Sequence, residues 1–245
     1  MRRLFLGAAA AVAMMNPAVA HAADGYLELG YSNADTDTTN IDTINFGGAV
    51  NFDLGGLDAQ ANAGYGRIDA GGTNYTLNTG ALHLFKRNDN FLIGGFAQVE
   101  DGFTILGSVY DVGVEGQLYL GRVTLDGGVS YTDFDTFEEN GATVRAGATY
   151  FVTDNLSVGA NGRMVDIDGD DVTTYGVNAE WRPASTAFSF FGGYRQTDEG
   201  LLLGGDDVDT WSIGFRYNLG NDSLMERNRS GASLPTGGTL VNGIF

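Results

Sequence analysis

The sequence of 245 residues contains no cysteine, which excludes disulfides, thiol catalysis and thiolate metal sites. Only three residues are proline, beside 38 glycines, so proline-rich linkers and collagen-like repeats are also excluded. Basic residues are scarce, because 13 lysines and arginines stand against 31 acidic residues and give a formal net charge of -18. Repulsion of that size disfavours nucleic acid or an acidic substrate as a partner.

Long apolar runs are missing as well, except for residues 4–15. This run follows the basic pair Arg2 and Arg3 and precedes the small-x-small sequence Ala20-His21-Ala22, the pattern of a secretory signal peptide. We therefore expect residues 1–22 to be removed, by cleavage after Ala22 or Ala20. No other stretch approaches the roughly 18 to 20 apolar residues of a transmembrane helix. Any membrane insertion would have to use strands.

The chain does have a repeated alternation of apolar and polar residues between residues 24 and 219. In residues 43–54, for example, Ile44, Phe46 and Phe52 alternate with Asn45 and Asn51. Successive side chains of a strand point to opposite faces, so each stretch has one apolar and one polar face. The polar face is too hydrophilic for a soluble core, which leaves lipid outside and water inside. The pattern predicts an all-β protein, a transmembrane antiparallel up-and-down barrel over residues 23–219, with 12 strands preferred and 10 as the alternative.

Two stretches, residues 75–85 and the one that follows residue 90, are the reason for the alternative count. We call the choice of which alternate positions of a strand face outward its parity. If one parity holds throughout, either Leu82 and Leu84 or Leu92 and Phe96 face inward. A β-bulge in either stretch would restore the pattern.

Aromatic residues at the outward positions test the parity independently. One group lies at the strand ends beside the longer loops: Tyr31, Phe46, Tyr65, Tyr75, Tyr110, Tyr131, Tyr175, Tyr194 and Trp211. The other lies beside the short turns: Phe52, Phe91, Tyr150, Trp181, Phe188 and Tyr217. These are the two girdles expected at the two headgroup levels of a membrane.

The last predicted strand contains Ser212, Gly214, Tyr217 and Leu219 in the spacing polar-x-Gly-x-x-aromatic-x-hydrophobic. Here the chain resembles the porin-like outer-membrane β-barrels of Gram-negative bacteria, whose last strand carries this assembly signal. The resemblance covers nearly all of residues 24–219. It implies export to the cell outer membrane, insertion by the barrel-assembly machinery, contact with membrane lipid and lipopolysaccharide, and short turns in the periplasm.

The signal usually ends such proteins, whereas residues 220–245 follow it here. Pro235 and the sequence Thr236-Gly237-Gly238 disfavour a further strand. We interpret residues 220–245 as a C-terminal periplasmic tail, with a plug in the lumen or an extra strand as the alternatives.

The same parity divides the charged residues of the lumen between two walls. We predict pore-lining arginines on strands eight to twelve: Arg145, Arg163, Arg182, Arg195 and Arg216. We predict pore-lining acids on strands one to seven: Glu28, Asp58, Asp111, Glu115 and Asp126. Glu180 is an exception, because it lies among the arginines. The division would set a transverse field across a narrow pore, and the alternative is that these groups pair and close it.

The longer loops are acidic, and negative mouths concentrate cations. Asp166, Asp168 and Asp170 have the spacing of a short calcium loop, but the distal glutamate is missing, so a solvated acidic loop is the better interpretation. No cofactor is expected.

An enzyme is not expected, because parity places His83, the one histidine after residue 22, on the lipid-facing side with Tyr75 and Leu77. We predict a channel for passive diffusion of small hydrophilic solutes or ions, mildly cation-preferring. The alternative is a non-conducting structural or adhesive barrel that displays acidic loops. The pattern does not specify the solute or the oligomeric state.

Overall fold

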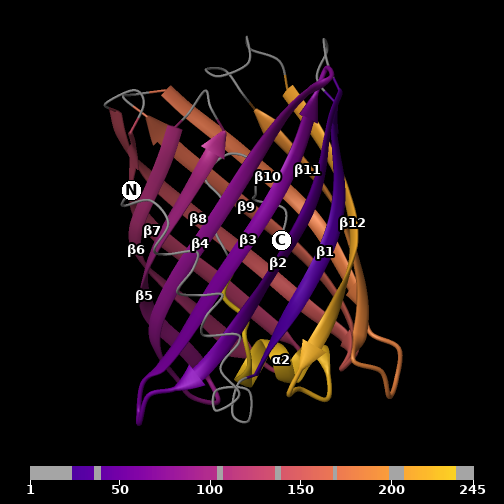
Figure 1. Ribbon diagram of the computed structural model, residues 1–245. Coiled ribbons are helices and arrows are strands. Elements are labelled where there is room, and N and C mark those ends of the chain that lie inside the picture. Colours follow the sequence, from indigo (N-terminus) through magenta and orange to yellow (C-terminus); the bar gives the residue numbers. More distant parts are fainter. Residues whose placement is uncertain are drawn as a thin grey trace.

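The computed structural model describes residues 24–35, 40–103, 107–135, 139–167, 170–198 and 207–235, so the predicted signal peptide lies outside the described residues. The described strands form a closed antiparallel barrel in which each strand pairs with its neighbours in the chain and β12 pairs with β1 (Figure 1). The strands are β1 (Asp24–Asp35), β2 (Asn40–Asp53), β3 (Asp58–Ala70), β4 (Thr73–Arg87), β5 (Phe91–Phe103), β6 (Gly107–Leu120), β7 (Val123–Phe134), β8 (Glu139–Thr153), β9 (Leu156–Ile167), β10 (Asp170–Trp181), β11 (Phe188–Asp198) and β12 (Asp207–Leu219). The preferred fold and strand count are confirmed.

Alternation decides which residues face outward. Val112 and Ile213 are 59% and 65% exposed on the outer face, whereas their neighbours Asp111 and Ser212 are buried on the inner face. A closed barrel satisfies its backbone hydrogen bonds between strands, and its outer apolar residues match the hydrocarbon of a membrane. No helix in the described parts of the chain is long and apolar enough to cross a membrane.

The connections at one end of the barrel are tight. Gly121 closes the β6–β7 turn with a φ of 60°, in the left-handed region that glycine adopts most easily. At the opposite end, Gly71 and Gly72 close an equally short β3–β4 turn where a longer loop was expected. The strands contain 11 to 15 residues, and all but the shortest exceed the roughly 9–11 that a membrane crossing requires. Several acidic residues expected in loops, such as Asp42 and Asp166, therefore lie on strand extensions.

The predicted parity of β4 is wrong. Leu82 and Leu84 are half exposed on the outer face, whereas Leu77 and His83 are buried on the inner face. Pairing of β4 with β3 is continuous from Thr73 to Phe85, so the parity follows from the tight turn and no bulge interrupts it. Tyr75 shares the inner parity and leaves the outer girdle.

Strand β5 has the parity expected if alternation is the same in every strand, because Leu92 and Phe96 face inward and are buried. Its register shift lies further along, between Glu100 and Phe103.

Most of the other predicted girdle aromatics are exposed on the outer face. Those near the longer loops are Tyr31, Phe46, Tyr65, Tyr110, Tyr131, Tyr175 and Trp211. Those near the short turns are Phe91, Tyr150, Trp181, Phe188 and Tyr217. Cross-strand ring contacts join Tyr194 to Trp211 and Phe188 to Tyr217.

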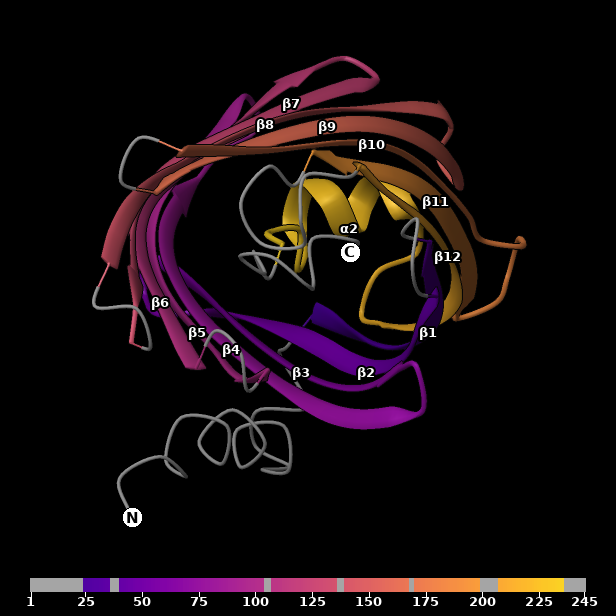
Figure 2. The same ribbon diagram turned by 90° about the horizontal axis from the view of Figure 1, so that it is seen from above.

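The chain turns inward after β12 instead of leaving the barrel. Gly220, with a φ of 81°, makes the turn, and helix α2 (Leu224–Ser230) lies inside the ring of strands at the short-turn end (Figures 1 and 2). Leu234 is buried in a cluster with Phe85, Leu92 and Tyr119 on the barrel wall. Residues 221–235 therefore lie in the lumen, as in the alternative interpretation, and do not form the expected periplasmic tail. We call these residues the C-terminal plug. Residues 236–245 lie outside the described residues.

Candidate functional site

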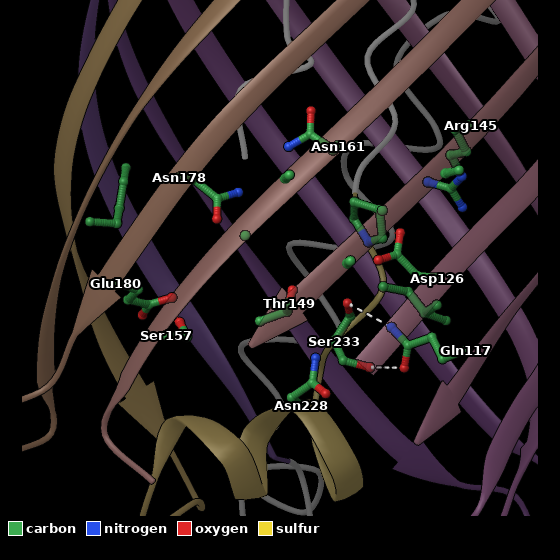
Figure 3. Close-up of a pocket in the computed structure, with 18 of the residues that line it drawn as sticks. Gln117, Asp126, Arg145, Thr149, Ser157, Asn161, Asn178, Glu180, Asn228 and Ser233 are labelled. Atoms are coloured by element: carbon green, nitrogen blue, oxygen red, sulfur yellow. Dashed lines mark hydrogen bonds between the residues drawn. The ribbon is translucent and has the colours of Figure 1, made fainter. Parts of the chain in front are cut away.

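A cavity of about 290 Å³, lined by both polar and apolar side chains, lies in the lumen beside the C-terminal plug. Figure 3 shows Asp126, Arg145, Asn161 and Asn178 on the barrel wall around it, with Asn228 of α2 below. Small residues on the wall make the space. A β-carbon at Gly147 would lie 2.6 Å from a carboxylate oxygen of Asp126, and one at Gly159 would lie 2.5 Å from Oδ1 of Asn178. The side chains of Asp126 and Asn178 therefore occupy the space that a larger residue would need at these glycines, and the centre of the lumen stays hollow.

Ion pairs form where the acidic wall and the arginine wall meet. Closure of the barrel brings β1 beside β12, and Arg216 Nε donates to Glu28 Oε2 at 2.6 Å. At the other seam, Arg145 on β8 pairs with Glu115 on β6. The predicted residues of the two walls thus meet and pair at these seams, while Arg87 of β4, on the predicted acidic wall, also points inward to the plug.

His83 belongs to the second seam, contrary to the sequence-based placement. Its Nδ1 lies 2.6 Å from Oε1 of Glu115, and its ring stacks on Phe96 at a centroid distance of 5.8 Å. The side chain is fully buried. Glu115 therefore joins His83 and Arg145 into one buried polar chain across β4, β6 and β8. The misplacement follows from the inverted parity of β4.

All ten predicted pore-lining residues have the inner parity. Arg163, Asp111 and Asp126 line the cavity directly. Asp58 is placed by its pairing with Phe85, which is buried inside the barrel. Arg182 is buried at the short-turn end, where it donates to the carbonyl oxygens of Thr186 and Asn221. Their role in conduction stays a prediction.

The calcium candidate gains no support. Asp168 lies outside the described residues, and the described parts of the chain contain no cluster of three or more histidine, cysteine or acidic residues that could hold a metal.

The plug is held on one side by the arginine wall. Arg227 donates from Nη1 to Glu180 Oε1 at 2.8 Å and from Nη2 to Glu180 Oε2 at 2.6 Å. Arg216 also donates to Glu180, at 2.6 Å. Glu180 is 8% exposed. The exception in the predicted charge pattern is therefore the residue that receives the plug.

The opposite side of the plug contacts β3, β4 and β6. Gln60 Nε2 donates to the carbonyl of Leu234 at 2.6 Å, and Arg87 donates to the carbonyl of Gly231 at 2.9 Å. Ser233 and Gln117 exchange hydrogen bonds, drawn as dashed lines in Figure 3. The plug consequently spans the lumen between opposed walls.

Sequence reasoning missed Arg227 and its helix, although a signal was present. Ser223 and Glu226 have the spacing of a capping box, which marks a helix start. In the structure Ser223 Oγ accepts from the Glu226 backbone amide at 3.1 Å, and Glu226 accepts from the Asp222 amide at 2.7 Å.

Residues 4–182, more than half of the chain, match the family model of the outer membrane protein β-barrel domain. The chain belongs to this family. The outer membrane is accordingly the location of this β-barrel protein. Among curated protein sequences no relative matches.

Solved outer-membrane barrels share the fold of this family member at low sequence identity. The NanC porin aligns with a TM-score of 0.58 and 12% identity, and the KdgM porin in complex with disordered oligogalacturonate with 0.57 and 10%. Each alignment covers 78% of this chain and 98% of the other. A Pseudomonas aeruginosa FadL homologue aligns with a TM-score of 0.51 and 11% identity, covering 85% of this chain and 94% of the other.

Proposed function

We propose that this outer membrane β-barrel is a channel for passive diffusion of small hydrophilic solutes or ions. The observation that carries the proposal is the hollow lumen, whose cavity of about 290 Å³ is bordered by charged and amide side chains. A barrel that served only as a structural element could fill its interior with apolar side chains. The similar solved barrels include porins, which agrees with this function.

The acidic strand ends support a mild preference for cations. Asp42, Asp207 and Asp209 are exposed on the outer side of the barrel rim, at the end opposite the plug. Carboxylates at a mouth raise the local concentration of cations, and salt screens the effect. The central lumen adds little net charge, because its seams are paired.

A non-conducting barrel is the second candidate, since the plug spans the lumen. A hydrolase has less support. His83 and Glu115 would supply a general base with its orienting carboxylate, but a nucleophile is also needed. Within the described residues, Nε2 of His83 has no hydrogen-bond partner. The channel therefore remains the function that the geometry supports best.

Planar-bilayer recording tests the channel. The folded protein should give discrete conductance steps, and a KCl gradient should give a reversal potential on the cation-selective side. Detergent-gel migration before and after boiling verifies that each sample is a folded barrel. Silence from correctly folded wild type and from a variant without the plug would favour the structural alternative.

Arginines between the seams should influence selectivity. We expect the double variant Arg163→Ser/Arg195→Ser to raise conductance or the K⁺ over Cl⁻ preference, because both side chains face the lumen. A unit charge at roughly 8 Å contributes about 0.5 kcal/mol in water before salt screening, or about a two-fold change in local ion concentration for each arginine. Arg67→Ser removes a charge from the outer face of β3 and serves as the control. An unchanged current in the double variant would contradict the lumenal role.

A further inference from the structure

Arg227 is held in the manner of a bound guanidinium ligand. Its two terminal nitrogens donate to the two carboxylate oxygens of Glu180, and Nη1 also donates to Oδ1 of Asn218. Its Cζ lies 5.5 Å from the ring centroid of Tyr26. A bidentate carboxylate, an amide acceptor and an aromatic face together match the planar fork of a guanidinium far better than a point charge.

The barrel wall builds this pocket without help from the plug. Ser189 is fully buried and donates to Glu180 Oε1 at 2.5 Å, and Asn218 donates to the Ser189 hydroxyl at 3.0 Å. Arg216 fixes the other oxygen of Glu180 and is itself held by Glu28. All of these residues belong to β1, β10, β11 and β12. The pocket should therefore keep its shape when Arg227 is absent.

Charge in the pocket also calls for a second cation. Glu28 and Glu180 carry two negative charges, and Arg216 supplies one positive charge, so one negative charge is left until Arg227 enters. Arg182, the next inward residue after Glu180, has its hydrogen bonds directed to carbonyl oxygens. A buried carboxylate that loses its cationic partner is costly, which favours any guanidinium able to replace Arg227.

The other attachments of the plug are mainly hydrogen bonds to the barrel wall, made at several places along it. Its helix has seven residues and buries one of them, Leu224. A helix of this length is marginal by itself in water. Beyond Arg227, the plug contacts the wall through Leu234 and through hydrogen bonds such as those of Gln60, Gln117 and Arg87. These contacts lie outside the strand pairing, so the plug can leave the lumen without breaking the strand hydrogen bonds of the barrel.

We propose that Glu180, Asn218 and Tyr26 form a binding site for small guanidinium cations, and that Arg227 occupies this site as an internal ligand that holds the plug in the lumen and so restricts the current. The proposal rests on the channel function. Glu180 and Arg227 both line the cavity, so a solute in the lumen reaches the place where they meet. A guanidinium solute competes with Arg227 for Glu180, and its binding releases the plug.

Deletion of residues 223–245 removes Arg227 and leaves the site empty, and bilayer recording measures the effect on the current. This deletion keeps Asn221, which accepts from Arg182. We expect larger conductance than in wild type, and block of the current by agmatine added on the loop side. The comparison probe is 1,4-diaminobutane, which has the same four-carbon spacer and the same charge but no guanidinium. Agmatine should block at a concentration about tenfold lower, because a bidentate charged pair is stronger than a single contact.

Glu180→Gln in the deletion variant should abolish the difference between agmatine and diaminobutane while the channel still conducts. Asp89→Asn removes a carboxylate from the exposed β4–β5 turn at the same end of the barrel and should retain the difference. Equal block by the two amines in the deletion variant would overturn the guanidinium site, and conductance unchanged by the deletion would overturn the closing role. Neither result would contradict the channel itself, which fails only if every folded variant is silent. If the deletion variant does not fold, Arg227→Gln in the full chain takes its place, with the same expected preference for agmatine.

Discussion

Oxidation of a Thr124→Cys/Asn228→Cys variant should close the channel, and a reductant should reopen it. Thr124 on β7 donates its hydroxyl to Oδ1 of Asn228 on α2 at 2.6 Å. The hydrogen bond places these two short side chains next to each other, and a disulfide between them needs β-carbons roughly 3.5–4.5 Å apart. Because the natural chain contains no cysteine, no other disulfide can form within the variant.

The expected effect of this cross-link is large. A disulfide that stabilises the plugged state by about 2–4 kcal/mol lowers the population of the displaced state by a factor of about 30 to about 1,000. Bilayer recording under oxidising and then reducing conditions measures the change on the same molecules. Each single cysteine variant should respond to neither condition. Equal currents from the oxidised and the reduced double variant would show that the plug does not leave the lumen during conduction.

The outer face of the barrel was predictable because lipid imposes one rule on nearly every strand. Outward residues such as Val112, Val177 and Ile213 are apolar, and a barrel in a membrane tolerates few exceptions there. Alternation therefore specified the fold, the twelve strands and most of the parity.

The inner face follows no such rule, and this explains the error in β4. Phe85 and Leu92 are apolar although they face inward, because Leu234 of the plug packs on them. On β4 both faces are thus rich in apolar residues, with Leu82 and Leu84 outside and Leu77 and Phe85 inside. Two opposite parities fit such a strand equally well. Only pairing with β3 and the tight turn at Gly71 and Gly72 distinguish them.

The charged walls of the lumen were predictable as positions on faces, but their pairing was not. Parity put Glu28 and Arg216 on the inner face, at opposite ends of the barrel sequence. Their contact requires the pairing of β1 with β12, which joins residues 188 positions apart. The contact between Glu180 and Arg227 could not be predicted either, because Arg227 lies beyond the last strand in a segment that has no strand pattern.

Loss of the Glu180 carboxylate should destabilise the barrel more than any other single change considered above. Its oxygens accept from Arg216, Arg227 and Ser189, and Glu180→Ala leaves two guanidinium groups without it. Removing one partner of a buried ion pair costs about 3–5 kcal/mol. We expect the lower end of that range, because Arg216 keeps Glu28 and Arg227 can follow the plug into water. Urea unfolding from lipid vesicles measures the loss, and Glu180→Gln should lose less.

The same substitution in the variant without residues 223–245 separates the plug from the wall. In that background Glu180→Ala removes only the contacts with Arg216 and Ser189. The loss of unfolding free energy should therefore be smaller than in the full chain, and the difference is the coupling energy between Glu180 and the plug. A difference of about 0.5–3 kcal/mol would be typical of residues in direct contact. Equal losses in the two backgrounds would mean that Arg227 contributes nothing to holding the plug, which would then be anchored by its other contacts, such as those of Leu234, Gln60 and Arg87.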